Sequence, residues 1–195
     1  MTRLWLVRHG QTDWNIEGRY QGISDVPLNA TGRSQAQEMG RILASNDINF
    51  QAIYSSHLKR AYETAIIIAH WLQLPVCVDE RLREMELGDW EANLYAEINQ
   101  KYPEKIQERL TNPAFTHAPG GESAVVVAER MSQAVEDIAA IHPGGDVIVV
   151  THGMSIKTIA AVANRDTFDR IYIDMPPHLE PVVVEWNPAN HNAYR

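Results

Sequence analysis

The chain has 195 residues, of which 45% are hydrophobic and 22% are charged, as in a globular protein with one sizeable core. The net charge of -8 argues against nucleic acid and anionic membrane as partners, because most faces of the molecule would repel a polyanion. Cys77 is the single cysteine, which excludes an intrachain disulfide, a zinc knuckle and a dithiol redox site.

The sequence shows no targeting or membrane segment. The apolar run at residues 4–7 is too short for a secretory signal, and no stretch approaches the length of a membrane span. We therefore expect a cytoplasmic protein. The sequence leaves open whether the chain forms a homodimer.

Strands and helices are predicted to alternate along the chain. Short apolar runs predict strands at residues 4–7, 51–54, 76–78, 146–150 and 182–186. Apolar residues at helical spacing predict helices at residues 31–44, 58–74, 94–110, 122–141 and 155–163. The helix at 94–110 is more polar, and it should break or bend near Pro103. This order predicts a three-layer α/β/α fold with a mainly parallel central sheet.

The whole chain, residues 1–195, is expected to form a single domain, because no repeat, low-complexity tract or linker divides it. Residues 84–121 are the largest excursion between predicted core elements. Long excursions in compact domains often carry function, so we expect this segment to be a small cap inserted over the site.

Basic side chains follow three predicted strands at the point where each strand ends. Arg8 and His9 follow the first strand, Arg60 comes shortly after the second, and His152 with Gly153 follows the strand at 146–150. The carboxyl ends of parallel strands meet at one edge of a sheet, so these residues could share one cleft. Arginine offers a planar fork of donors that matches phosphate oxygens, and imidazole can be a nucleophile or a donor. The pattern favours a phosphate site.

Six segments together resemble the motifs of a known family. They are residues 6–15 (LVRHGQTDWN), 19–32 (RYQGISDVPLNATG), 54–61 (YSSHLKRA), 82–91 (LREMELGDWE), 119–123 (PGGES) and 150–153 (VTHG). In this order they resemble the histidine phosphatase superfamily, which includes the phosphoglycerate mutases, and the segment at 82–91 resembles its phosphatase branch.

The resemblance implies a role for each matching residue. His9 would be the nucleophile that becomes phosphohistidine, and Glu84 the acid that protonates the leaving oxygen. The phosphate pocket and its surroundings would be formed by Arg8, Asn15, Gln21, Gly22, Arg60, His152 and Gly153. The resemblance implies a small phosphorylated substrate and neither a metal nor another cofactor.

The implied chemistry agrees with the residue types. A nucleophilic histidine must be neutral, and nearby arginines lower its pKa by making another positive charge unfavourable. A bound phosphate dianion acts in the opposite direction, so a local hydrogen bond that orients the ring matters as much as the pKa. Arginine and histidine would hold the equatorial phosphate oxygens, as metal ions do in kinases.

The identity of the acid is open from the residues alone. Six carboxylates crowd one stretch, at positions 79, 80, 84, 86, 89 and 91. The family position selects Glu84. Glu86 is the reserve choice, because in a strand it would share a face with Glu84.

The chain departs from the family pattern at two places. The phosphatase branch usually has glycine where this chain has Ala92, and a small residue where it has Met154. We expect both to lie beside the pocket and not in it. Mutases of the family also carry an adjacent arginine pair in the cap. Here Lys101, Lys105 and Arg109 stand at helical spacing, which is more typical of a solvated face.

These observations predict a phosphomonoesterase that acts on small phosphorylated metabolites through a phosphohistidine. The alternatives are a cofactor-dependent phosphoglycerate mutase, against which the missing arginine pair argues, and a phosphatase dedicated to α-ribazole phosphate. A catalytically dead phospholigand-binding module is a third, and the complete set of catalytic residues counts against it.

The remaining aromatic and histidine residues give weaker signals. Trp14 and Trp90 are expected to wall the pocket, and three cap residues, Tyr95, Phe115 and His117, are candidates for substrate contact. The six histidines other than His9 and His152 show no ligand spacing, so we expect no metal site at His57, His70, His117, His142, His178 or His191.

Overall fold

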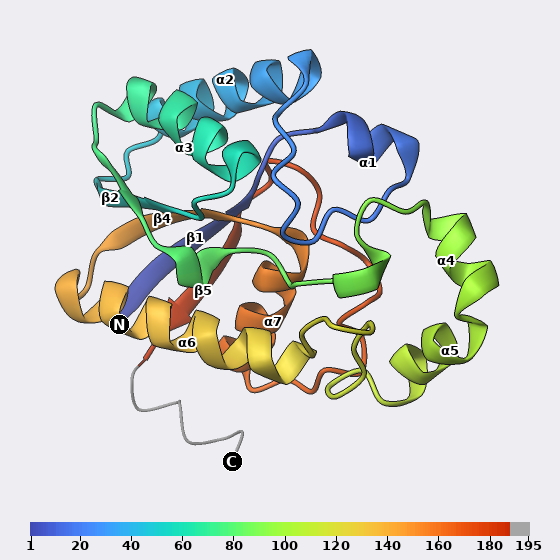
Figure 1. Cartoon of the computed structure of the whole chain (residues 1–195). Coiled ribbons are helices and arrows are strands. Elements are labelled where there is room, and N and C mark those ends of the chain that lie inside the picture. The colour runs from blue at the N-terminus through green and yellow to red at the C-terminus, as the bar shows by residue number, and fades with distance from the viewer. Residues whose placement is uncertain (188–195) are drawn as a thin grey trace.

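A five-stranded, mostly parallel sheet forms the centre of the molecule (Figure 1). The computed structural model describes residues 1–187. The strand order is β3-β2-β4-β1-β5, and only β5 runs antiparallel to its neighbour. The strands are β1 (Thr2–Arg8), β2 (Phe50–Ser55), β3 (Val76–Val78), β4 (Asp146–Thr151) and β5 (Val182–Trp186). Each strand predicted from the sequence is present.

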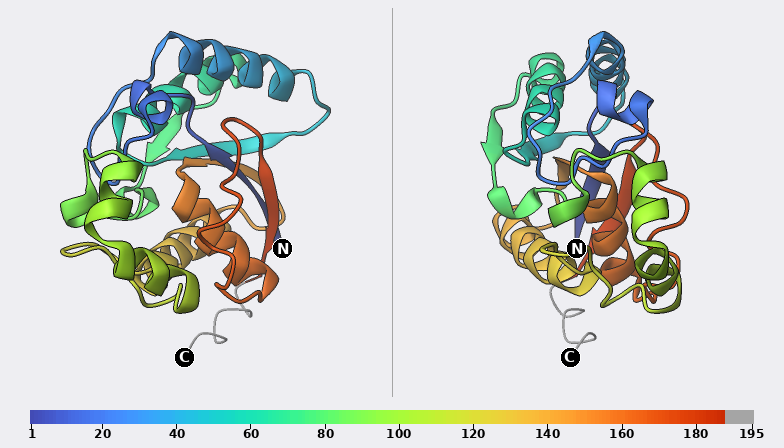
Figure 2. Two further views of the ribbon diagram at one scale, coloured as in Figure 1. Left: turned by 90° about the vertical axis from the view of Figure 1, so that its right-hand side faces the viewer. Right: turned by 45° about the vertical axis from the view of Figure 1, so that its right-hand side comes forward.

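Two pairs of helices cover the two faces of the sheet. One layer holds α2 (Ala30–Ala44) and α3 (Lys59–Leu72), and the other holds α6 (Ala124–Ile141) and α7 (Gly153–Asn164) (Figures 1 and 2). Side chains of a strand point alternately to opposite faces, and β4 shows this clearly. Val147 and Val149 pack into the core under α6 and α7, whereas Ile148 and Val150 belong to the core under α2 and α3. The predicted three-layer fold is confirmed.

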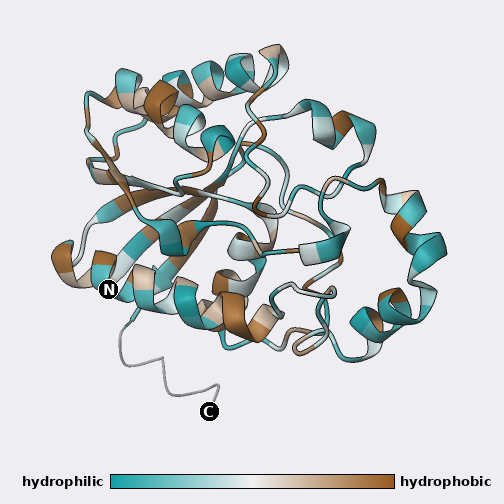
Figure 3. Cartoon of the chain, viewed as in Figure 1, coloured by the Kyte–Doolittle hydropathy of each residue, from teal (hydrophilic) through white to brown (hydrophobic). Residues whose placement is uncertain are grey.

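The covering helices are amphipathic, as helices that pack on a sheet from one side must be. Figure 3 shows hydrophilic and hydrophobic residues side by side around each of them. In α6, for example, Met131 and Val135 are fully buried, while the neighbouring Glu129 and Glu136 are exposed. Within residues 1–187, no helix is both long and apolar enough to cross a membrane.

Three short helices lie away from these layers, on the side shown at the right of Figure 1. They are α1 (Asp13–Glu17), α4 (Tyr95–Lys101) and α5 (Pro103–Thr111). The predicted break near Pro103 is confirmed, because α4 ends at Lys101 and Pro103 begins α5, where its missing N–H costs nothing.

The acidic stretch differs from the sequence-based expectation. Two 3-10 turns, η1 (Glu80–Leu82) and η2 (Gly88–Trp90), flank residues 84–87, which form no strand. The strand-face argument that made Glu86 the reserve acid is therefore wrong. Ala92 follows with a left-handed backbone, at φ 64°, a conformation that glycine adopts without strain.

Candidate active site

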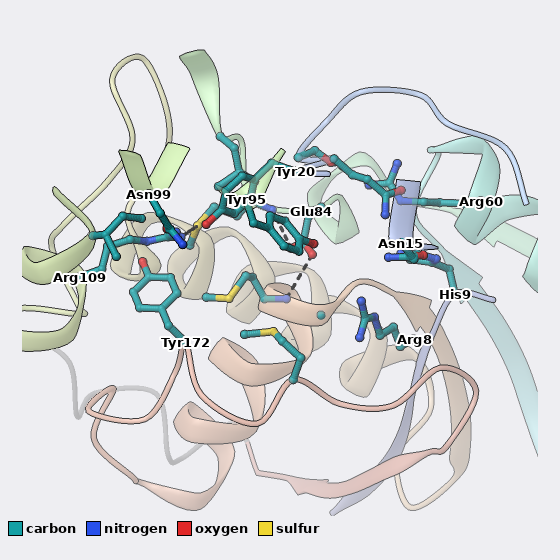
Figure 4. Close-up of a pocket in the computed structure, with 18 of the residues that line it drawn as sticks. Arg8, His9, Asn15, Tyr20, Arg60, Glu84, Tyr95, Asn99, Arg109 and Tyr172 are labelled. Atoms are coloured by element: carbon teal, nitrogen blue, oxygen red, sulfur yellow. Dashed lines mark hydrogen bonds between the residues drawn. The ribbon is translucent and has the colours of Figure 1, made fainter. Parts of the chain in front are cut away.

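A cavity of about 360 Å³ opens where β1 and β4 end. Figure 4 shows Arg8, His9, Asn15 and Arg60 gathered at one end of it, and Asn99, Arg109 and Tyr172 at the other. Glu84, Tyr20 and Tyr95 lie between the two groups. The volume is in the range of pockets that hold small molecules. Sequence-distant motifs therefore meet in one site, as the parallel sheet predicts.

His9 is buried directly after β1, and its ring is fixed by its own neighbour. The ring atom Nδ1 lies 2.7 Å from the carbonyl oxygen of Gly10, which can only accept a hydrogen bond. Nδ1 therefore carries the proton, and Nε2 is the basic nitrogen. Burial, and then the positive charges of Arg60 and Arg8, hold the pKa of His9 well below its usual value. The ring is neutral, as a nucleophile requires.

Glycine is required at the turn after the nucleophile. A Cβ atom on Gly10 would lie 2.5 Å from the carbonyl oxygen of Gly32, the residue near the start of α2. No side chain fits in that space. The close approach of the two glycines sets the path of the chain just beyond His9, and the Gly10 N–H donates to the hydroxyl of Thr64 at 3.1 Å.

Backbone carbonyls hold the two arginines near His9, of which Arg60 is fully buried and Arg8 partly buried. Arg8 donates through Nη1 to the Pro176 carbonyl at 2.7 Å. Arg60 donates through Nη1 to Ser24 and through Nη2 to Gly22, each at 2.7 Å. Burial lowers the pKa of Arg60 to about 10, so the guanidinium keeps its charge at neutral pH. Two fixed positive charges therefore flank His9.

His152 lies fully buried beside the nucleophile, with 5.2 Å between the two ring centroids. Its Nε2 is 2.9 Å from the Ser56 hydroxyl, which also accepts the backbone N–H of Leu58 at 3.3 Å. Its Nδ1 is a buried atom without a hydrogen-bond partner within residues 1–187. Burial, and then the charge of Arg60, keep the pKa of His152 well below its usual value. A neutral imidazole with one unpartnered nitrogen thus lies beside His9.

Glu84 lines the cavity and is oriented by the first turn of α7. Its carboxylate accepts the backbone N–H groups of Met154 at 3.2 Å and Ser155 at 3.3 Å. Free N–H groups at a helix start hold anions in this way. Glu86 does not line the cavity, and its backbone N–H donates to Glu122 at 3.0 Å. The geometry thus favours Glu84 over the reserve choice.

A capping box in α1 positions the polar wall next to His9. Thr12 is the N-cap residue, and its backbone N–H donates to the amide oxygen of Asn15 at 3.0 Å. This leaves the amide nitrogen of Asn15 to donate to a ligand. The Thr12 hydroxyl also lies 3.1 Å from the amide oxygen of Gln21, and both Gln21 and Gly22 line the cavity.

Several sequence-based expectations about the pocket walls are wrong. Met154 lines the cavity, although we expected it beside the pocket. Trp14 and Trp90 do not line it, and Trp90 is a fully buried core residue. Of the three cap candidates only Tyr95 lines the cavity, while Phe115 is exposed.

Arg109 contradicts the prediction of a solvated basic face. Lys105 pairs with Glu108 at 2.7 Å and is half exposed, as expected. Arg109, in contrast, is only 8% exposed and lines the cavity. Pro103 also starts a new helix, so Lys101 belongs to α4 and the other two residues to α5.

The segment between α7 and β5 supplies site residues that sequence reasoning missed. Tyr172 and Met175 line the cavity, and His178 donates from Nδ1 to the His9 carbonyl oxygen at 2.6 Å. Burial, and then the charge of Arg8, lower the pKa of His178 to about 4. The segment has neither helix nor strand, so it carries no periodic signal.

Residues 1–187 contain no group of three or more His, Cys, Asp or Glu side chains that could hold a metal ion. His191 lies outside the described residues. The charge that would meet an anionic group next to His9 comes from Arg8 and Arg60.

A neutral histidine between two arginines, with a carboxylate in the same cavity, defines a site for phosphoryl transfer. The comparisons agree. The sequence profile of the histidine phosphatase superfamily (branch 1) matches residues 4–189. The chain therefore belongs to this superfamily, as the motifs predict.

Three related proteins show how far the similarity extends. Phosphoserine phosphatase 1 of Hydrogenobacter thermophilus is 35% identical over 159 residues, which cover 82% of this chain and 74% of the relative. Phosphoglycerate mutase-like protein 4 of Arabidopsis thaliana is 41% identical over 156 residues, covering 79% and 67%. The structure of mycobacterial glucosyl-3-phosphoglycerate phosphatase in complex with VO3 has a TM-score of 0.88 and 32% identity, and the match covers 96% of this chain and 93% of that one. The chain is a phosphoric monoester hydrolase of the small-metabolite type.

Proposed function

We propose that the chain hydrolyses phosphomonoesters of small metabolites through a phosphohistidine at His9. The tautomer of His9 carries this proposal: Nδ1–H bonded to the Gly10 carbonyl leaves a basic Nε2 on a ring that lines the cavity. The lowered pKa keeps that nitrogen unprotonated at neutral pH.

In the first step Nε2 of His9 attacks phosphorus in line with the leaving oxygen. The P–N bond forms as the P–O bond breaks, and Glu84 in its acid form gives its proton to the departing oxygen. Arg8, Arg60 and His152, with its ring proton on the unpartnered Nδ1, would stabilise the equatorial oxygens.

In the second step water attacks the phosphohistidine. Glu84, now a carboxylate, takes the proton of the water while the P–N bond breaks and His9 returns to its neutral form. Phosphate and the alcohol are the products, and no redox partner is needed.

Residues 84–121 serve as the cap in this proposal. This segment contributes Glu84, Tyr95, Asn99 and Arg109 to the cavity, so it would determine which leaving groups fit. We further propose a cytoplasmic location, where the exposed thiol of Cys77 would persist in reduced form.

Mutase activity is the second candidate, because one relative is named a phosphoglycerate mutase-like protein. We expect hydrolysis to dominate, because Lys101 and Lys105 lie outside the cavity and only one cap arginine lines it. A coupled enolase assay should show little interconversion of the two phosphoglycerates. Mutase turnover faster than monoester hydrolysis would favour the other candidate.

Trapping the covalent intermediate tests the proposed mechanism. After incubation with a radiolabelled monoester and an alkaline quench, which preserves a P–N bond, the label should lie on the peptide that contains His9. His9→Ala should remove both label and turnover, while His57→Ala, a change at an exposed histidine, should leave both. Substantial turnover in His9→Ala would refute the phosphohistidine.

A further inference from the structure

We propose that the substrate carries a carboxylate in addition to its phosphate, and that Arg109 binds this carboxylate at the end of the cavity opposite His9. This inference rests on the proposed function, because it takes the phosphate to lie at His9. It assigns a substrate class: phosphomonoesters in which a spacer separates the phosphate from a carboxylate.

The first observation is that Arg109 is buried without an acidic partner. The residue is 8% exposed, and none of the ion pairs among residues 1–187 involves it. Within residues 1–187, its Nε is a buried donor that makes no hydrogen bond. Burying an unpaired charge is costly, so a site that keeps one is suited to receive a counter-ion.

The second observation is that neutral groups hold Arg109 in place. The Tyr172 ring centroid lies 3.9 Å from its guanidinium carbon, and that of Trp90 lies 4.8 Å away. Nη2 is 4.0 Å from the sulfur of Met85. Burial raises the pKa of the nearby Tyr20, and the charge of Arg109, with a hydrogen bond, opposes that rise. These contacts orient the guanidinium without neutralising it.

Stacked aromatic rings leave the edge of a guanidinium as its binding surface. That edge offers parallel N–H donors at the spacing of two carboxylate oxygens. A single arginine matches one negative charge. The other cations of the cap point elsewhere, since Lys105 pairs with Glu108 and Lys101 is exposed. The charge balance therefore favours a carboxylate over a second phosphate.

The third observation is the position of Arg109 relative to the nucleophile. Figure 4 places Arg109, Asn99 and Tyr172 at one end of the cavity, with Tyr95 and Glu84 between them and His9. A substrate that reaches both ends must be extended. An ester whose far end is uncharged would leave the guanidinium unpaired and should bind more weakly.

Non-hydrolysable phosphonates test this inference without relying on turnover. We would measure by calorimetry the binding of ω-phosphonoalkanoic acids of increasing chain length, each paired with its neutral primary amide. At the best chain length the wild type should bind the acid about 10- to 100-fold more tightly than the amide, the scale of a hydrogen-bonded charge. Equal binding of acid and amide at every length would overturn the inference.

Variants then show which residue causes the preference for the acid over the amide. Arg109→Gln should abolish the acid-to-amide ratio, and Arg109→Lys should keep part of it, because the charge remains while the fork is lost. Lys105→Gln, which removes the same charge from the same helix, should keep the full ratio. An unchanged ratio in Arg109→Gln would refute the assignment. Because binding is read directly, absent turnover would refute the proposed function and leave this result standing.

Discussion

Nδ1 of His9 and the carbonyl oxygen of Gly10 lie 2.7 Å apart, so the peptide bond next to the nucleophile fixes its tautomer. This contact needs no residue from elsewhere in the chain. The neutral state of the ring has a different origin: burial comes first, followed by the charges of Arg60 and Arg8. Orientation is therefore local, whereas the pKa depends on the folded site.

The first prediction concerns this neutral ring. In spectra of isotopically labelled histidine, His9 should show Nδ1–H and a bare Nε2 at neutral pH and still at pH 6.5, where an ordinary imidazole is half protonated. Arg60→Ala should raise the pKa of His9, because it removes one of the charges that lower it. A His9 ring that gains a proton near pH 6.5 in the wild type would contradict the prediction.

The second prediction concerns the acid. Glu84→Gln should slow hydrolysis of an alkyl phosphate by about 100-fold or more, but that of a nitrophenyl phosphate far less, because a good leaving group departs without a proton. Glu86→Gln is the matched control, since it makes the same change two residues away on a side chain that does not line the cavity. If only Glu86→Gln slowed the alkyl phosphate more than the nitrophenyl phosphate, the role of the acid would belong to Glu86.

The catalytic end of the cavity could be predicted from the sequence because its residues stand in short motifs next to strand ends. Arg8 ends β1 and His9 follows it, while Gly153 comes two residues after the end of β4. Because β1 and β4 are parallel neighbours, the sheet alone brings these residues together. The fold could be predicted equally well, because residues 147–150 of β4 are a continuous apolar run between two amphipathic helices.

The far end of the cavity could not be predicted for two physical reasons. Arg109 belongs to a polar helix whose sequence suggests exposure to solvent. Its burial depends on packing against Trp90 and Tyr172, which are distant from it in the sequence. Tyr172 and His178 lie in a segment without regular structure, where periodicity carries no information. A buried arginine in a polar helix has no local signature.

The third prediction is a stabilising substitution at Ala92. Its left-handed backbone, at φ 64°, costs an alanine about 1–2 kcal/mol, and the greater freedom of glycine in the unfolded chain offsets part of this. Ala92→Gly should therefore raise the free energy of unfolding by about 0.5–1 kcal/mol. Ala96→Gly, on the exposed face of α4, should lower it by about 1 kcal/mol. Urea denaturation measures the free energy of unfolding of both variants. A change of the same sign in Ala92→Gly and Ala96→Gly would refute the argument.

The fourth prediction concerns the ion cluster that supports the backbone of Glu84. Glu122 accepts hydrogen bonds from Arg83 at 2.8 Å, Arg130 at 3.0 Å and the Glu86 N–H at 3.0 Å. Arg130 also donates to the Glu84 carbonyl at 3.0 Å. Burial alone would raise the pKa of Glu122, but the hydrogen bonds from the two arginines outweigh it and lower the pKa to about 2.

The sign of the pH dependence follows from that lowered pKa. The folded pKa of Glu122 lies below the unfolded value of 4.5, so its contribution to stability is complete above about pH 4.5 and is lost as the pH falls toward 2. Glu122→Gln should cost about 2–3 kcal/mol at neutral pH, and its stability should fall less than that of the wild type between about pH 5 and pH 3. Glu38→Gln is the control, because its pair with Arg41 is exposed and screened by solvent. Parallel acid-unfolding curves for Glu122→Gln and wild type would show that the cluster does not hold this loop through its charge.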